Sequence, residues 1–331
     1  MPTEPQFDVV AIGNALVDVI AHADDAFIAH YGLSKGTMAL IDAAQADAFY
    51  AEMPPAVESS GGSAGNTIAG FASLRGAAAY IGKVADDDLG RVFRHDMTAL
   101  GVAYDVPPAA GASTGRCLIL VTPDAERTMQ TYLGAGADLG PDDVNDSLIA
   151  SSRVTYLEGY LWDPPGAKDA FLKAARIAHE AGRRVALTLS DPFCVDRFRS
   201  EFQDLVAGHI DVLFANESEI TSLYEVPTFD EALQRVRGHC EIAALTRSEK
   251  GAVIVTADEL HIVDAEPARV VDTTGAGDLY AAGFLFGLTH GRDIVTCGRI
   301  GAICAAEVIS HYGARPEVSL SELVARRLGS R

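Results

Sequence analysis

Short apolar runs rich in β-branched residues alternate with longer segments of helical periodicity along most of this chain. Apolar runs bounded by turn residues indicate buried strands, whereas apolar positions three or four residues apart indicate amphipathic helices. We expect strands at 8–12, 79–82, 154–158, 184–189, 212–215, 242–246 and 252–256. We expect helices at 63–74, 89–100, 165–181, 217–224, 276–288, 293–310 and 319–328. This alternation is typical of βαβ units and predicts an α/β fold with a mainly parallel sheet.

One segment breaks the alternation. The sequence TGRCLILVTPDAERTMQTYL at 114–133 contains two strand-like runs around a Pro-Asp-Ala turn, with no helix before the next strand. This pattern predicts an antiparallel hairpin. We expect the hairpin to join 16–23 and 37–41 in a small sheet that stands apart from the main one. Such a sheet would serve as a lid, because closing elements exclude water from a site.

Composition narrows the classes of function. Of the 331 residues, 48% are hydrophobic, and the formal net charge is −20 with no basic run. The chain can bury a sizeable core, and its charge argues against a nucleic-acid partner or an anionic membrane surface, since both favour clustered Lys and Arg. The five cysteines form no CxxC pair, which suits free thiols in a reducing compartment and indicates no zinc site.

The chain shows no targeting pattern. Its first residues, MPTEPQFDVVAIGN, lack a basic segment, and no apolar run reaches the roughly 18 residues that span a bilayer. No repeat or low-complexity linker divides the sequence. We therefore expect a cytoplasmic protein without a membrane partner, folded as one domain over 1–331, with the lid formed by roughly 16–42 and 103–134.

The sequence DTTGAGD at 272–278 places small residues directly before an apolar helix. Nearly bare backbone N–H groups at a helix N-terminus, here at Gly275, Ala276 and Gly277, form an anion site that would stabilise a developing phosphoryl charge. Asp278 then falls in the first helical turn, where it could accept a hydroxyl proton. The alternative is that Asp278 only caps the helix. A Rossmann fingerprint would need glycine at Tyr280, and no Walker A sequence is present.

A second small-residue stretch, GGSAGNTIAG at 61–70, also precedes a helix. Gly61 and Gly62 permit close backbone approach and unusual dihedral angles, and Asn66 offers both a donor and an acceptor. The alternative is an ordinary helix start capped by Ser63 after a glycine hinge.

Four motifs together resemble the ribokinase or PfkB family of carbohydrate and nucleoside kinases: GNALVDV, GGSAGNTIAGFASLRG, NESE and DTTGAGD. The resemblance covers nearly the whole chain. It implies a ribokinase-like fold, doubly wound and flanked by helices, with a β-sheet lid. It also implies ATP as the phosphoryl donor and Mg²⁺ as its metal.

The resemblance assigns roles on the phosphoryl side. Asp278 resembles the family's general base, and residues 275–277 resemble its anion hole. Asn216 and Glu219 match the NxxE element that organises hydrated magnesium, although N-E-S-E is also a good helix cap. In TRSEKG, only Thr246 and Gly251 match the family's nucleotide-binding pattern.

On the acceptor side, the family positions that bind a sugar correspond to Asn14, Asp18, Gly61, Gly62 and Asn66; for Asp18 the alternative is a turn aspartate. Arg127 resembles a lid arginine that closes over phosphates, and the alternative is a hairpin arginine in solvent. As in several members of the family, Asp272 and Thr274 could contribute backbone or side-chain oxygens to a site for a monovalent cation such as K⁺.

The motifs GNALVDV, ERTMQTYLGA and TRSEKGA look more like adenosine kinases and their bacterial sugar-kinase neighbours than like ribokinase or fructokinase. We expect ATP-dependent phosphorylation of the primary hydroxyl of a ribonucleoside, with adenosine as the substrate and AMP as the product. A kinase for ribose, fructose or 2-keto-3-deoxygluconate is the alternative within the family. A nucleotide or sugar sensor without activity, or a nicotinamide-dependent oxidoreductase, is the alternative outside it. The expected partner is a small molecule, with the protein a monomer or a homodimer.

Overall fold

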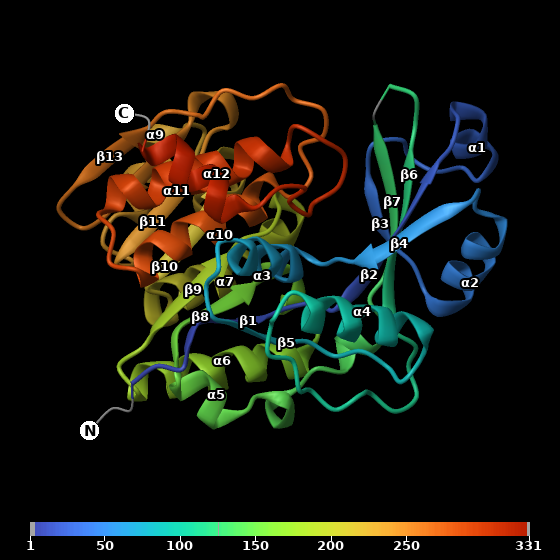
Figure 1. Ribbon diagram of the computed structural model, residues 1–331, viewed down its shortest axis with the longest axis horizontal. Coiled ribbons are helices and arrows are strands. Elements are labelled where there is room, and N and C mark those ends of the chain that lie inside the picture. The colour runs from blue at the N-terminus through green and yellow to red at the C-terminus, as the bar shows by residue number, and fades with distance from the viewer. Residues whose placement is uncertain (1–3, 125, 330–331) are drawn as a thin grey trace.

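The large sheet forms the centre of the molecule. The computed structural model describes residues 4–124 and 126–329, and Figure 1 shows two sheets at an angle to one another. The larger has eight strands in the order β13-β12-β11-β10-β9-β8-β1-β5, parallel from β5 to β11 and antiparallel at β12 and β13. Its strands are β1 (Phe7–Ile12), β5 (Ala78–Ile81), β8 (Ser152–Glu158), β9 (Arg184–Thr188), β10 (Val212–Asn216), β11 (Ile242–Thr246), β12 (Ala252–Val255) and β13 (Leu260–Val263).

Helices cover both faces of this sheet because successive strand residues alternate between two cores. Along β1, Val9 and Ala11 lie in one apolar core, while Val10 and Ile12 lie in the other. The first core packs α3 (Ser63–Ser73), α4 (Asp88–Ala99), α10 (Ala276–Thr289), α11 (Ile294–Val308) and α12 (Leu320–Gly329). The second packs α5 (Asp146–Ala150), α6 (Pro165–Glu180), α7 (Pro192–His209), α8 (Glu217–Tyr224) and α9 (Phe229–Val236).

The smaller sheet has the order β3-β7-β6-β2-β4. Its strands are β2 (Leu16–His22), β3 (Met38–Leu40), β4 (Ala56–Ser60), β6 (Gly115–Val121) and β7 (Arg127–Tyr132). The antiparallel pairing of β6 with β7 confirms the predicted hairpin, although Ala125 of the predicted turn lies outside the described residues. Helices α1 (Asp25–His30) and α2 (Ala43–Glu52) pack against one face through a separate small core.

The predicted class, a mainly parallel α/β sheet with a second small sheet, is confirmed. Four short 3₁₀ helices complete the described elements: Gly134–Asp138, Pro141–Asp143, Gly159–Trp162 and Ser248–Lys250. In the part of the chain that the structure describes, no helix combines the length and apolarity needed to cross a membrane. The two sheets meet where β1 continues into β2 and where β4 leads into α3, which brings the predicted acceptor residues to the carboxyl end of the large sheet.

Candidate active site

The turn before α10 carries the predicted general base. Gly275 has φ +77°, and a Cβ built on it would lie 2.8 Å from the Cβ of Ala314. Only glycine adopts this left-handed conformation without strain and also leaves room for Ala314. Asp278 follows in the first turn of α10, whose residues 279–285 are all buried. The packed body of α10 therefore fixes the position of the Asp278 side chain.

Two side chains of α3 hold the Asp278 carboxylate. Ser63 Oγ donates to one oxygen at 2.6 Å, and Asn66 Nδ2 donates to the other at 3.0 Å. Burial raises the pKa of Asp278 to about 6, although these two hydrogen bonds and the charge of Arg315 oppose the rise. At neutral pH the group is mostly ionised and is more basic than a free aspartate, as a general base requires.

The turn itself borders open space at one residue. A Cβ built on Gly277 would meet no atom within 4 Å. The N–H of Ala276 donates to the Thr273 carbonyl at 3.2 Å, so this amide is already engaged inside the turn. The positive end of the α10 dipole and the open side of Gly277 leave a place for an anion next to Asp278.

The acceptor-side glycines pack against predicted site residues. A Cβ on Gly61 would lie 2.4 Å from the carboxyl carbon of Asp18, and a Cβ on Gly62, at φ +83°, would lie 2.2 Å from the carbonyl oxygen of Asn14. The structure therefore brings β2, the β1–β2 connection and the start of α3 together around Asp18. The pair is more than a hinge before a capped helix, because both glycines are required by contacts.

Asp18 shares its surroundings with Asp278. Burial raises the pKa of Asp18 to about 6, the charges of Arg315 and Arg127 lower it, and the charge of Asp278 raises it again. The effect of Asp278 on Asp18 shows that these two residues, 260 positions apart in the sequence, lie near enough to interact electrostatically.

A buried glutamate, which the sequence did not single out, organises the acceptor side. Glu158, 1% exposed at the end of β8, accepts hydrogen bonds from Asn14 Nδ2 at 2.7 Å and from the Ala64 amide at 2.8 Å. Burial raises its pKa to about 7. Its only sequence signal is a carboxylate that ends an apolar strand, VTYLE. Glu158 thus joins the β1–β2 connection to the N-terminus of α3.

Two amide oxygens at this site lack protein partners. Among the described residues, Asn14 Oδ1 and Asn66 Oδ1 are buried and accept no hydrogen bond. A buried acceptor without a partner is unfavourable, so such atoms mark places where a ligand donor would bind. Ligand hydroxyl groups would satisfy both.

Arg127 reaches from β7 to the turn before α10. Its Nη1 donates to Thr274 Oγ1 at 2.9 Å, its Nη2 lies 3.1 Å from Asp272 Oδ2, and its side chain is 9% exposed. This arginine is therefore buried and not in solvent. Through it, the small sheet contacts the turn before α10, where the phosphoryl group is predicted to bind. Asp272 also accepts from the amides of Thr274 at 3.1 Å and Gly313 at 2.9 Å. Both carboxylate oxygens of Asp272 are therefore engaged, one of them by a guanidinium, so a monovalent cation here would have to use backbone oxygens of Asp272 and Thr274.

The predicted nucleotide and magnesium residues lie at the ends of β10 and β11. Asn216 and Glu219 form a capping box, with Asn216 Nδ2 donating to Glu219 Oε1 at 2.5 Å, and Asn216 pairs in register with Thr246. Gly251 has φ +82°, and a Cβ there would lie 2.1 Å from the Val263 carbonyl oxygen. The interpretation of N-E-S-E as a helix cap is thus confirmed, because Asn216 and Glu219 cap α8.

Glu219 is nevertheless more than a surface cap. It is 5% exposed, and burial raises its pKa to about 7, with the charges of Asp191 and Asp278 acting in the same direction. No group of three or more His, Cys, Asp or Glu side chains able to hold a metal occurs in residues 4–124 and 126–329. A single buried carboxylate fits Mg²⁺ held through water, because this ion keeps several of its waters.

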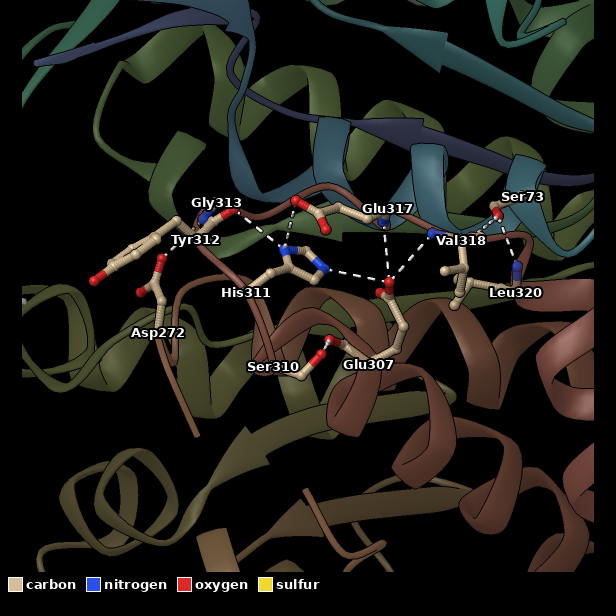
Figure 2. A network of polar contacts seen from close by, with 10 residues as sticks. All are labelled: Ser73, Asp272, Glu307, Ser310, His311, Tyr312, Gly313, Glu317, Val318 and Leu320. Carbon is tan, nitrogen blue, oxygen red and sulfur yellow. Dashed lines mark hydrogen bonds and ion pairs between the residues drawn. The ribbon is translucent and has the colours of Figure 1, made fainter. Parts of the chain in front are cut away.

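The loop between α11 and α12, residues 309–319, also contacts the candidate site. Figure 2 shows Glu307 Oε1 accepting hydrogen bonds from the amides of Glu317 at 3.0 Å and Val318 at 3.3 Å, with His311 Nε2 3.2 Å away. The same loop supplies the Gly313 amide to Asp272. No role was predicted for this loop, because its sequence GARPEV carries no motif of its own.

The family model described as pfkB family carbohydrate kinase matches residues 8–320. The chain belongs to the PfkB family. It is 55% identical to the adenosine kinase of Sinorhizobium meliloti, whose crystal structure superposes with a TM-score of 0.91 and covers 98% of this chain and 99% of that one. A crystal structure described as a probable sugar kinase from Rhizobium etli is 52% identical, with a TM-score of 0.93 and the same coverage of 98% and 99%. Adenosine kinase from Saccharomyces cerevisiae is 30% identical over 92% of this chain and 95% of its own.

This PfkB kinase is a phosphotransferase that acts on an alcohol group, as members of the family are. Family membership implies ATP as the co-substrate and a small molecule as the acceptor. The predicted family and enzyme class are therefore confirmed.

Proposed function

We propose that this PfkB kinase phosphorylates the primary 5′ hydroxyl of a ribonucleoside, with adenosine as the substrate and AMP as the product. The observation that carries the proposal is that Ser63 and Asn66 hold the Asp278 carboxylate, whose charge also acts on Asp18. A carboxylate and an amide can bind vicinal ribose hydroxyls, which leaves the 5′ hydroxyl for Asp278. The names of the S. meliloti and S. cerevisiae relatives support adenosine.

In the proposed reaction, Asp278 takes the proton from the 5′ hydroxyl while the 5′ oxygen of the nucleoside attacks the γ-phosphorus of ATP. The bond from that phosphorus to the β–γ bridging oxygen breaks, and ADP leaves. The transferred group would lie against the turn at residues 275–277, where the dipole of α10 would favour its charge. Asn216, Thr246 and Gly251 would contact ATP, and Glu219 would hold the waters of Mg²⁺, whose chemistry is to neutralise phosphate charge.

We propose that the small sheet, within 16–42 and 103–134 and extended by β4, acts as the lid. Arg127 supports this role because it extends from β7 to Thr274. With a guanidinium fork it would turn from Asp272 and Thr274 toward the phosphates once ATP binds.

A sugar kinase is the second candidate. The R. etli structure at 52% identity is described as a probable sugar kinase, and the residues that would bind ribose in a nucleoside would also bind a free furanose. With MgATP, we expect ADP release to be fastest with adenosine in a panel that includes other nucleosides, ribose, fructose and 2-keto-3-deoxygluconate. Preference for a free sugar would overturn the nucleoside assignment. Absence of turnover with every acceptor would favour a sensor.

A further inference from the structure

Arg315 lies in the loop after α11 and reaches across the molecule to the acceptor side. Its Nε and Nη2 donate to the Ser60 carbonyl oxygen at 3.1 and 2.8 Å, and Nη2 also donates to Ser60 Oγ at 3.0 Å. Its Nη1 donates to the Gly65 carbonyl oxygen at 2.9 Å. One guanidinium therefore holds both ends of the segment that contains Gly61 and Gly62.

This segment needs an external anchor. Gly61 has Asp18 against its Cα, and Gly62 lies at φ +83° against the Asn14 carbonyl. Glycine is the most flexible residue, so two in succession do not hold such a shape by themselves. The planar guanidinium fork of Arg315 fixes the carbonyl groups on either side of them, which a lysine ammonium does with fewer directed hydrogen bonds.

Arg315 also brings positive charge to a site dominated by carboxylates. Its charge lowers the pKa of both Asp18 and Asp278 against the effect of burial. The other titratable groups that interact with Asp278 or Asp18 come from the neighbouring elements, and most are acids; they are Tyr156 and Glu158 on β8, Tyr160 after it, Glu219 on α8, Cys117 on β6 and Arg127 on β7. Arg315 is thus the cation that acts on both aspartates.

The loop that carries Arg315 is fixed on the phosphoryl side. Ala314, the preceding residue, packs against Gly275, and the Gly313 amide donates to Asp272. Glu307 anchors the other end of the loop through the amides of Glu317 and Val318 (Figure 2). The position of the guanidinium is therefore tied to the turn that holds Asp278.

We propose that Arg315 is a positioning residue for phosphoryl transfer: it holds the Gly61–Gly62 segment against Asp18 and supplies positive charge to both Asp18 and Asp278. The inference rests on the proposed function, because it assigns Asp18 to acceptor binding and Asp278 to proton removal. It predicts two separable effects, one on acceptor affinity and one on the pH dependence of turnover.

The test is the pH profile of kcat/KM for adenosine at saturating MgATP, in wild type, Arg315→Met and Arg315→Lys. In Arg315→Met, we expect the midpoint of the acid limb to rise by about one pH unit, because a lost neighbouring cation typically moves a carboxyl pKa by that much. We expect KM to rise at least about tenfold in the same variant. Arg315→Lys should keep the midpoint near that of wild type while KM still rises, since it retains the charge and loses the fork.

Arg94→Met is the matched control. Arg94 is also partly buried and donates to a backbone carbonyl, that of Val106, but it belongs to α4 and pairs with neither aspartate. Its loss should leave the midpoint and KM unchanged. A folded Arg315→Met with an unmoved midpoint would overturn the inference, and so would an Arg315→Lys profile with wild-type KM. If Arg315→Met does not fold, Arg315→Lys decides, because a shifted midpoint there shows that charge is not the cause.

Failure of the proposed function gives a different result. In that case wild type shows no turnover of adenosine, or Asp278→Asn keeps full activity. Failure of the Arg315 inference instead shows an active wild type and an inactive Asp278→Asn, together with an unmoved midpoint in Arg315→Met or a wild-type KM in Arg315→Lys.

Discussion

The two glycine turns of this kinase look alike in sequence, but their surroundings differ. At the first turn, a Cβ on Gly61 or Gly62 would collide with Asp18 or with the Asn14 backbone. At the second turn, Gly275 is enclosed by Ala314, whereas Gly277 has nothing within 4 Å. The first turn is filled by the protein itself, and the second leaves space beside its aspartate. We infer that one turn shapes the acceptor site and the other receives the transferred group.

Similar glycine-rich sequences can therefore have different roles: one turn makes room for other parts of the protein, and the other makes room for a ligand. Glycine is needed where protein atoms approach closely or φ is positive, and also where a ligand must approach the backbone. Substitutions at the first turn should therefore act on folding and acceptor binding. Substitutions at the open part of the second turn should act on turnover.

The sharpest contrast comes from Asp278→Asn. Asparagine keeps the shape of the side chain and removes the proton acceptor, so we expect kcat to fall by about 10² to 10⁴. Asp293→Asn is the control, because Asp293 also stands at a helix start and caps α11 in solvent. The control should keep wild-type kcat in a steady-state assay. Near-normal turnover in Asp278→Asn would contradict the assignment of the base.

Gly62→Ala tests the filled turn. Alanine at this position would have to keep a positive φ, and its methyl group would lie 2.2 Å from the Asn14 carbonyl oxygen. We therefore expect a loss of about 1–3 kcal/mol in the free energy of unfolding. Gly182→Ala separates the two causes, because Gly182 has φ +67° and open space around it. Urea unfolding should show the larger loss for Gly62→Ala. Equal losses would mean that contact with Asn14 contributes nothing.

Gly277→Ala tests the open turn. Alanine has a higher helix propensity than glycine, and its methyl group meets no protein atom here, so the free energy of unfolding should stay the same or rise slightly. The methyl group would occupy space next to the transferred phosphoryl group, and we expect kcat/KM to fall by about tenfold. An unchanged kcat/KM would show that the phosphoryl group lies elsewhere.

The pH dependence separates activity from stability. Burial raises the pKa values of Asp18 and Asp278 to about 6, above those of the unfolded chain, so the folded protein binds more protons between about pH 4 and 6. The free enzyme should therefore lose stability, on the order of 1 kcal/mol for each of the two carboxylates, as the pH rises from 5 to 7.5, while kcat/KM increases. Thermal melting and initial rates over this range check both trends. Parallel trends would contradict the pKa directions.

Much of this architecture could be predicted from the sequence. The strands of the parallel sheet and the helices at 217–224 and 276–288 follow from apolar runs with clear turn and cap residues. Strand β4 and helices α1 and α2 were not predicted. The sequence of β4, AVESS, is short and mostly exposed, so no period-2 pattern of burial marks it. The edge strand β13 was missed for the same reason.

In the candidate site, too, some residues could be predicted from the sequence and others could not. Asp278, Gly275 and Gly62 stand in recognisable motifs, and the structure places them close together as expected. Glu158 and Arg315 stand in no motif, and they matter through partners 94 and 255 residues away in sequence. Such contacts depend on how the chain returns to the same place in space. The pairing of Arg127 with Asp272 could likewise not be predicted from the sequence, because it depends on where the small sheet lies relative to the turn before α10.

Transfer of phosphate to the 5′ oxygen of a nucleoside is tested most directly by ³¹P NMR of a reaction that contains adenosine, ATP and Mg²⁺. We predict a new phosphomonoester resonance, split by the two 5′ protons, that grows together with ADP in wild type and stays absent with Asp278→Asn. Absence of this resonance in wild type, or equal product formation by Asp278→Asn, would contradict the prediction.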